Sequence, residues 1–427
     1  MRTVRRTNRE RLHCRAVILA QAFQRFAFDL DGVVWKGDDP IPGAPETIRA
    51  LRDAGKRVCF VTNNSAEVAD TYVRKLDRMG AGATASEIVS SADATAHMLD
   101  RDVPGVRGRL AFVIGGEGLR AAVASVGARL ASLEEGSDAS VVVVGIDRDL
   151  TYDKLRAATL AIRKGATFIA SNADATYPYP EGLVPGAGAI VAALRTASGV
   201  EPAVAGKPDP TMLEIAAERL GGTPALAVGD RLDTDILAAH TAGWPCVLVL
   251  SGASGVPDLA VARVWPDFIV RRLSDLLVDR PFAKVRSATG PDLPHIAGIL
   301  HAGGLISGAA RERLGRTVVA EVDRKVIGTG AWELAGESAI LRSVGVDEAC
   351  RGAGVGTLVV GAVLRRIAEA GHRDVYLATD GAEEFFVLCG FRPFAREDAP
   401  PAVIEHRQIA RECPSTATLM RLRLPFA

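Results

Sequence analysis

Short apolar runs alternate with longer amphipathic stretches from Phe26 to about Asp279. The apolar runs have the length of buried strands, and the stretches between them place apolar residues at helical spacing. This alternation predicts an α/β fold in which a parallel sheet is covered on both faces. The predicted strands fall at 25–35, 57–64, 110–115, 140–146, 167–172, 224–230 and 246–250. The predicted helices include 44–54, 152–164 and 210–220.

Polar clusters follow three of these predicted strands. They occupy residues 29–31, 62–64 and 229–235. Ligands of open parallel sheets bind beyond the carboxyl ends of the strands. We therefore expect the three clusters to converge on one site, although they lie far apart in the sequence.

A second pattern begins after residues 278–284, which we interpret as a domain boundary. Residues 317–334 predict a β-hairpin that turns at Asp323-Arg324. A strand at 338–346, a Gly-rich turn, a helix at 357–370 and a strand at 374–379 follow. The residues after the boundary therefore predict a separate α+β domain at 284–427.

Composition and charge narrow the class of protein. Of the 427 residues, 48% are hydrophobic and 24% charged, which excludes a disordered chain, a collagen-like fibre and a small disulfide-stapled scaffold. The 51 Lys and Arg residues balance the 51 Asp and Glu residues, so no net field attracts nucleic acid or an anionic membrane. No apolar run approaches the roughly 20 residues that span a bilayer. We expect two or three domains that bind neither nucleic acid nor membrane.

The cysteines and the N-terminus add little chemistry. The six cysteines form no C-x-x-C pair and have no His at ligand spacing, so no zinc site is expected. Most of them lie in apolar runs, which predicts reduced, buried thiols and a cytoplasmic location. Residues 1–22 are rich in Arg but lack the full apolar region and cleavage site of a signal peptide. We interpret them as a disordered basic extension or an over-long start, and exclude them from the fold in either case.

The first polar cluster has the chemistry of phosphoryl transfer. Asp29 and Asp31 are two residues apart at a strand end, so both carboxylates face one way and can hold Mg²⁺ while one oxygen attacks phosphorus. The segment GDRLDTD supplies further hard oxygen ligands, and Thr62 and Lys207 can bind phosphate oxygens. Each motif alone is more often a turn, a helix cap or a surface residue. Their order, each after an apolar strand, favours a functional site.

The segments FDLDGVVWKG, VTNNS, GKPDP and GDRLDTDI resemble the four motifs of the haloacid dehalogenase superfamily. They match its branch with a large α/β cap between the second and third motifs, over about residues 26–279. The resemblance implies a Rossmann-like core at 23–82 and 203–279 and a cap at 83–202. This branch includes p-nitrophenyl phosphate, sugar phosphate, pyridoxal phosphate and glycerol phosphate phosphatases. We therefore expect a phosphatase of small phosphate monoesters, of the glycerol 3-phosphate or sugar phosphate type.

The resemblance assigns roles residue by residue. Asp29 is implied to be the nucleophile that forms an aspartyl phosphate, and Asp31 the general acid and base. Mg²⁺ would be held by Asp29, the backbone carbonyl of Asp31 and Asp230, with Asp235 as a supporting carboxylate. The residues implied to bind the phosphate are Thr62, Asn63, Asn64 and Lys207. Members of this branch are often dimers, so a homodimer is the expected assembly.

The cap loop SNADATYPYPEGLVPGAGAI resembles the stretch by which this branch closes on its substrate. The candidates for contacting the leaving group are Asn172, Asp174 and Tyr177. In the alternative interpretation, the glycines and proline of this loop only shape the return to the core. These residues are Gly182, Pro185, Gly186 and Gly188.

The Gly-rich turn RGAGVG (351–356) follows a predicted strand and opens a predicted helix. Backbone N–H groups at such a turn can bind phosphate oxygens, although a plain helix start has the same pattern. The longer segment SVGVDEACRGAGVG resembles the acetyl-CoA motif of GNAT acetyltransferases. The segments AEEFFVLCGF and IEHRQIARECPSTATLM resemble, in turn, the last helix and following strand of that family and the C-terminal signature of arsenic-resistance-associated acetyltransferases.

The GNAT resemblance implies an acetyl-CoA site with two parts. The pantetheine arm would pair with the backbone of Val344 and Val346. The pyrophosphate would bind the turn formed by Arg351, Gly352, Gly354 and Gly356. These assignments predict an N-acetyltransferase fused to the phosphatase.

One position departs from the GNAT pattern. Many members have a Tyr as general acid before the final Gly-Phe pair, and Phe386 occupies that place. A phenyl ring donates no proton, so another group serves or the domain binds acetyl-CoA without turnover. Glu383 and Glu384 fit a solvated helix face, and Cys389 and Cys413 are more often core thiols than nucleophiles. The alternative to a bifunctional enzyme is a phosphatase whose GNAT domain is a regulatory acetyl-CoA-binding module.

Overall fold

The computed structural model describes residues 16–179, 182–305 and 312–425. The chain forms two compact units. The N-terminal unit comprises Phe23–Gly252 and Arg272–Ser274. Among the described residues, the C-terminal unit comprises 16–22, 253–271, 275–305 and 312–425.

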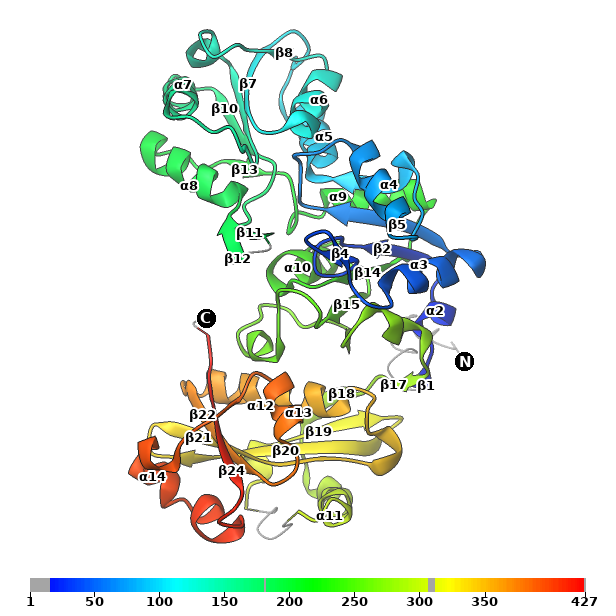
Figure 1. Ribbon diagram of the computed structural model, residues 1–427, viewed down its shortest axis with the longest axis vertical. Coiled ribbons are helices and arrows are strands. Elements are labelled where there is room, and N and C mark those ends of the chain that lie inside the picture. The colour runs from blue at the N-terminus through cyan, green and yellow to red at the C-terminus, as the bar shows by residue number, and fades with distance from the viewer. Residues whose placement is uncertain (1–15, 180–181, 306–311, 426–427) are drawn as a thin grey trace, which may run out of the picture. The chain divides into compact units, whose positions relative to one another are not determined.

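The first sheet has six strands in the order β16-β15-β14-β2-β5-β6 (Figure 1), with β16 (Phe268–Val270) at one edge and the other five paired in parallel. These strands are β15 (Cys246–Val249), β14 (Leu226–Gly229), β2 (Arg25–Phe28), β5 (Arg57–Thr62) and β6 (Ile88–Ser90). Around them lie α3 (Ala44–Asp53), α4 (Ala69–Arg78), α5 (Ser91–Asp102), α9 (Thr211–Leu220), α10 (Leu237–Thr241) and the hairpin of β3 (Trp35–Lys36) with β4 (Asp39–Pro40). The predicted parallel sheet is confirmed, because its apolar runs are long enough to be buried on both faces.

A second parallel sheet of the N-terminal unit has the order β13-β10-β9-β7-β8. These strands are β13 (Ala203–Val204), β10 (Thr167–Ala170), β9 (Val141–Val144), β7 (Leu110–Ile114) and β8 (Arg129–Leu130). They lie with α6 (Glu117–Ser125), α7 (Tyr152–Arg163), α8 (Ala187–Ser198) and the hairpin of β11 (Thr176–Tyr179) with β12 (Gly182–Pro185). All four valines of β9 are buried, and α7 and α8 bring their apolar faces to the same core. This inserted sheet is drawn in cyan and green in Figure 1.

The C-terminal unit contains a seven-stranded sheet in the order β18-β19-β20-β21-β22-β24-β23. These strands are β18 (Lys284–Ser287), β19 (Thr317–Val322), β20 (Lys325–Ala335), β21 (Ser338–Val346), β22 (Asp374–Thr379), β24 (Thr418–Arg423) and β23 (Arg392–Pro393). Only β21 and β22 pair in parallel in this sheet. Its helices are α11 (Leu293–Ala302), α12 (Val355–Glu369), α13 (Glu383–Leu388) and α14 (Pro401–Ile404).

Two details of this unit bear on the sequence predictions. The predicted hairpin turn is confirmed, since Asp323 and Arg324 both adopt positive φ values, of 50° and 65°, between β19 and β20. Such values are typical of the two-residue turns that match strand twist. The expectation that α13 is the last helix is wrong, because α14 follows it before β24.

Residues 16–22 belong to the fold, so the prediction that all of residues 1–22 lie outside it is wrong for this part. β1 (Ala16–Val17) pairs antiparallel with β17 (Arg280–Pro281), and α2 (Leu19–Ala22) buries Leu19 completely. Apolar residues of this part, Leu19 and Ala20, are thus used for packing. Residues 1–15 lie outside the part of the chain that the structure describes.

Among the described residues, no helix is both long and apolar enough to cross a membrane. The five described cysteines form no disulfide with one another, and Cys59, Cys246 and Cys389 are buried. Burial raises the pKa of the Cys59 and Cys389 thiols to about 12. These two thiols are therefore protonated at neutral pH and behave as small apolar side chains.

Candidate functional site

Asp29 and Asp31 follow the carboxyl end of β2. The backbone N–H of Asp29 donates to Val228 O on β14 at 2.8 Å, so this residue continues the sheet. The Asp31 carboxylate accepts a hydrogen bond from the indole N–H of Trp35 at 3.0 Å. Burial raises the pKa of both carboxyl groups, and nearby Lys207 opposes that rise at Asp29. The two carboxylates therefore follow the same strand but have different partners.

Lys207 lies between two carboxylates. Its ammonium donates to Asp29 Oδ1 and to Asp235 Oδ1, each at 2.6 Å, and to Val61 O at 3.0 Å. The side chain is only 4% exposed. Burial alone would lower the pKa of Lys207, but Asp235 and Asp29 raise it above its usual value, so the ammonium stays charged.

Asp235 orders the loop after β14. Its second oxygen, Oδ2, accepts from the backbone N–H groups of Asp230 and Arg231 at 3.2 and 3.0 Å. Both oxygens of Asp235 are thus used in holding Lys207 and the loop. This arrangement agrees with the supporting role that the resemblance implied for Asp235.

Three carboxylates provide a donor set for a hard cation. Asp29, Asp230 and Asp235 each bring an oxygen within 4.8 Å of the others, and all three are buried. Carboxylate oxygens in such a cluster are ligands that Mg²⁺ accepts. Gly32, at φ 83°, and Gly252 leave room for this cluster, because a Cβ on either residue would overlap the Asp230 carboxylate. The Asp31 carboxylate is not part of the cluster.

The loop after β5 connects the candidate nucleophile to the inserted domain. Asn63 Oδ1 accepts from Lys207 N at 2.9 Å, and Asn63 Nδ2 donates to Lys207 O at 3.1 Å. Thr62 Oγ1 accepts from Asn64 N, and Asn64 Oδ1 accepts from Ala66 N. The side chains of Asn63 and Asn64 therefore fix the backbone of the loop. Thr62 is buried at the strand end beside them.

The structure brings two of the three candidate cap residues to this loop. Asn172 Nδ2 donates to Asn63 O at 2.7 Å, and its Oδ1 accepts from Asp174 N at 3.2 Å. The Asp174 carboxylate accepts from Asn63 Nδ2 at 3.1 Å. Burial raises the pKa of Asp174. Tyr177 lies in β11, and its side chain is outside what the structure describes.

Sequence reasoning missed four residues that support this site. Trp35 hydrogen-bonds Asp31, Ser91 donates to Asn63 O at 2.5 Å, and the hydroxyls of Ser65 and Ser171 are 2.8 Å apart in the buried interior. Trp35 is in the stretch that resembles the first motif and could have been considered. The serines carry no distinguishing pattern, because Ser is common at turns and helix caps.

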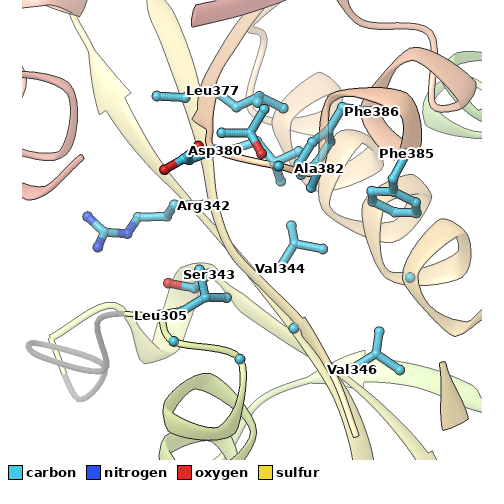
Figure 2. A pocket seen from close by; sticks show the side chains of 18 of the residues that line it. Leu305, Arg342, Ser343, Val344, Val346, Leu377, Asp380, Ala382, Phe385 and Phe386 are labelled. Carbon is cyan, nitrogen blue, oxygen red and sulfur yellow. The ribbon is translucent and has the colours of Figure 1, made fainter. Parts of the chain in front are cut away.

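A cavity of about 790 Å³ lies in the C-terminal unit, where β21 and β22 separate. The two strands are paired at Ala339↔Val375 and Ile340↔Tyr376, and the cavity is lined by the residues that follow on both. Figure 2 shows Val344 and Val346 on β21 and Phe385 and Phe386 on α13 around it. The opening between the strands leaves backbone groups of β21 available to a ligand.

The predicted acetyl-CoA residues converge on this cavity. Its lining includes Val344, Val346, Arg351, Gly352, Gly354 and Gly356. Gly354 precedes α12 with φ 86° and Gly352 has φ 75°, which L side chains rarely adopt. A Cβ at Gly356 would lie 3.0 Å from the Phe385 ring. The glycines thus permit both the turn and its close packing.

Phe386 lies at the cavity and is 9% exposed, so the apolar ring stands where many GNAT enzymes have a phenol. Cys413 also lines the cavity, and burial raises its pKa. Among the described residues, Cys389, Glu383 and Glu384 do not line it.

Comparison with known proteins identifies three regions of the chain. Residues 26–129 match the haloacid dehalogenase-like hydrolase model, residues 204–276 match a second hydrolase model of this type, and residues 313–393 match the GNAT acetyltransferase domain. A D-glycerol 3-phosphate phosphatase from Mycobacterium tuberculosis is 42% identical over 64% of this chain and 76% of its own length. An acid sugar phosphatase from Staphylococcus aureus is 35% identical over 60% of this chain and 98% of its own length.

A solved structure extends the likeness into the C-terminal unit. The glycerol phosphate phosphatase of Mycobacterium tuberculosis in complex with magnesium is 30% identical, with a TM-score of 0.64. The match covers 87% of this chain and 97% of that one. The chain therefore belongs to the haloacid dehalogenase-like hydrolase family and carries a C-terminal GNAT acetyltransferase domain.

Proposed function

We propose that the N-terminal unit is a Mg²⁺-dependent phosphatase that hydrolyses a small phosphate monoester through an aspartyl-phosphate intermediate on Asp29. The observation that carries this proposal is the position of Asp29. Its carboxylate follows the central strand β2, is held by Lys207 and lies beside Asp230 and Asp235. The similarity to a D-glycerol 3-phosphate phosphatase and to an acid sugar phosphatase supports a substrate of the glycerol 3-phosphate or sugar phosphate type.

The donor set fits Mg²⁺, since Asp29 and Asp230 supply carboxylate oxygens and the backbone carbonyl of Asp31 is the third predicted ligand. When bound, Mg²⁺ neutralises charge on the phosphate that is transferred. Lys207 supplies a second positive charge and orients the Asp29 carboxylate. Thr62 and the backbone N–H groups of its loop bind the remaining phosphate oxygens, while Asn63 and Asn64 hold the loop in place.

The reaction proceeds in two displacements. An oxygen of Asp29 attacks phosphorus, the bond to the ester oxygen breaks, and Asp31 donates a proton to the departing alcohol. Water then attacks the aspartyl phosphate, Asp31 takes the proton of the water, and inorganic phosphate leaves as the Asp29 carboxylate is restored. The hydrogen bond from Trp35 keeps Asp31 oriented through both steps.

The inserted domain selects the alcohol in this proposal. Asp174 and Asn172 are joined to the loop that holds Lys207 through Asn63. They and Tyr177 are the proposed contacts for the leaving group. A substrate that binds these residues is thereby connected directly to the loop that orients the phosphate.

Phosphate release from a panel of small esters, with and without Mg²⁺, tests the proposal. Asp29→Asn should lower the turnover number by about 10⁴-fold or more, because the amide is no nucleophile. Asp233→Asn is the matched control, since Asp233 lies in the loop of Asp230 but is 69% exposed and pairs with Arg231. Wild-type turnover in Asp29→Asn would refute the mechanism.

We propose that the C-terminal unit binds acetyl-CoA along β21 with its diphosphate at the turn before α12. In acetyl transfer, the nitrogen of an amine attacks the thioester carbon, the C–S bond breaks, and the thiolate of coenzyme A takes a proton. Phe386 supplies no proton for that step, which favours a second candidate function. In that case the domain binds acetyl-CoA and regulates the phosphatase without transferring the acetyl group.

Calorimetry and thiol release separate the two functions. Acetyl-CoA binding with release of free coenzyme A in the presence of a panel of amines supports a transferase. Binding without release from any amine supports the regulatory module. Gly354→Glu should remove binding in either case, since its side chain would fill the phosphate turn.

The predicted domain limits and the homodimer are part of the proposal as well. The limits are 23–82 with 203–279, 83–202, and 284–427, and limited proteolysis of the full chain tests them. Light scattering tests the dimer. A mass of about twice the chain supports it, and a mass equal to the chain contradicts it.

A further inference from the structure

The segment 256–271 lies inside the region that matches a hydrolase model. It is grouped with the C-terminal unit, although its strand β16 (Phe268–Val270) is the edge strand of the sheet that contains β15. The 3₁₀ turn Val256–Ala260 lies against α12, where a Cβ at Gly361 would be 2.8 Å from Leu259 Cδ1. A Cβ at Gly390 would be 2.6 Å from Pro257 Cγ. Two glycines of the acetyltransferase part thus make room for side chains of this segment.

The end of the segment reaches the Gly-rich turn. The backbone oxygen of Ile269 is the nearest atom, at 3.7 Å, to a Cβ placed on Gly354. Phe268 and Ile269 also share a small cavity with Gly354 and Val355. Two residues later, Arg271 joins Arg351 and Gly354 in lining the large cavity.

The backbone of Arg271 is fixed, while its side chain is available. Its N–H donates to Asp275 Oδ2 at 3.0 Å, and Asp275 Oδ1 accepts from Arg280 at 2.5 Å in a buried ion pair. The Arg271 side chain is exposed and forms no ion pair with any residue that the structure describes. A guanidinium with unused donors is thus anchored beside the turn.

The other two arginines that line the cavity, Arg342 and Arg351, already make side-chain contacts within the protein. Arg342 is buried and already paired with Glu333 at 3.3 Å and with Glu412 at 2.7 Å. Arg351 uses its Nε–H on Val346 O at 3.4 Å. Arg271 therefore offers its whole guanidinium to a ligand, beside Arg351, which keeps its terminal N–H groups.

We propose that Arg271 binds a phosphate group of acetyl-CoA and completes the cofactor site of the acetyltransferase domain. The inference rests on the proposed acetyl-CoA site. Coenzyme A carries a diphosphate and a 3′-phosphate, and a guanidinium binds either one with paired hydrogen bonds. The phosphate end of the site then combines backbone N–H groups of the GNAT turn with an arginine from the region that matches the hydrolase model.

Calorimetry on the full chain with coenzyme A tests the assignment. Arg271→Ala should weaken binding about tenfold, the usual effect of losing a charged hydrogen bond. Arg271→Lys keeps the positive charge but loses the paired N–H donors of the guanidinium. Its affinity for coenzyme A should lie between those of the wild type and Arg271→Ala. Arg272→Ala is the matched control, since this neighbouring exposed arginine does not line the cavity. Its affinity should equal that of the wild type, and so should the melting temperature of Arg271→Ala.

Dephospho-coenzyme A identifies the phosphate. If Arg271→Ala and wild type bind it equally, Arg271 recognises the 3′-phosphate; if the tenfold loss persists, Arg271 recognises the diphosphate. The variant Gly354→Glu distinguishes a failure of the Arg271 assignment from a failure of the proposed acetyl-CoA site. Loss of binding in Gly354→Glu with wild-type affinity in Arg271→Ala would overturn the role of Arg271 alone. Wild-type affinity in Gly354→Glu would overturn the acetyl-CoA site itself.

Discussion

The two candidate sites of this chain differ in the groups that form them, which are side chains at the hydrolase site and backbone atoms at the acetyltransferase cavity. At the hydrolase site, charged side chains from separate loops hold one another, as Lys207 does with Asp29 and Asp235 at 2.6 Å. At the acetyltransferase cavity, the binding groups expected from the sequence are backbone atoms of β21 and of the turn before α12. A single side-chain change should therefore destroy the first site, whereas the second should lose its binding completely only through changes that fill a glycine.

Removal of the metal should have the largest effect that distinguishes the two sites, because it should affect phosphate release but not acetyl-CoA binding. Dialysis against a chelator should reduce phosphate release to the background rate, because the Asp29, Asp230 and Asp235 carboxylates need a cation to accept a phosphate dianion. The binding heat for acetyl-CoA should not change. Added Mg²⁺ should restore phosphate release. Full activity in the chelated protein would contradict the comparison.

Lys207→Met should lower turnover by about 10²- to 10³-fold, since the variant loses a positive charge that faces the reacting phosphate. It should also lower the free energy of unfolding by about 3 to 5 kcal/mol, because Asp29 and Asp235 are left without their shared cation in a buried site. Steady-state kinetics and urea titration measure the two effects. Lys36→Met, at an exposed lysine, is the control. An equal effect of both variants would exclude a special role for Lys207.

Leu259→Ala tests whether the segment 256–271 belongs energetically to the acetyltransferase unit. Leu259 is fully buried, so its truncation should lower the free energy of unfolding of that unit by about 2 to 5 kcal/mol. Acetyl-CoA binding should weaken in partly denaturing urea while phosphate release persists. Leu277→Ala, at a leucine that is 38% exposed, should have a much smaller effect. Loss of phosphatase activity before acetyl-CoA binding would reverse the interpretation.

The smallest expected effect concerns pH and the acetyltransferase unit. Arg286 donates to both oxygens of buried Asp292, at 2.7 and 2.9 Å, and holds the pKa of Asp292 well below its usual value. The ionised form is thus stabilised on folding. This contribution is complete above about pH 5 and is lost as the pH falls below about 4. Asp292→Asn should cost about 1 kcal/mol at pH 7, and the difference from wild type should shrink on acidification. A difference that grows at low pH would contradict this assignment.

The sequence predicted the features that depend on residues close together in the chain, namely the strands and the acidic residues at their ends. Apolar runs such as Val141–Val144 became strands of parallel sheets, and the acidic residues after β2 and β14 met as expected because carboxyl ends of parallel strands share one edge. The tertiary packing partners of individual side chains could not be predicted. Nothing in the sequence distinguishes a leucine that packs on α12 from one that packs on the hydrolase sheet, so the contact of Leu259 with α12 is known only from the folded chain.

The same limit applies to polar groups. The side chain of Asn63 is bonded to the Lys207 backbone and to Asp174, residues that only the folded chain brings near. Phosphate binding by Asn63 stays a prediction. Hydrogen-bond partners across long sequence separations depend on tertiary geometry, which periodicity does not encode. Residues 16–22 were excluded because a short apolar patch gives no indication of the distant strand that pairs with it.

The central claim is that Asp29 carries the phosphoryl group. The most direct measurement stops the enzyme with acid during turnover of a phosphate-labelled ester and maps the label on the protein by mass spectrometry. The account predicts label on Asp29 in the wild type and in Asp233→Asn, and none in Asp29→Asn. Label on another residue, or rapid turnover in the absence of any labelled protein, would contradict it.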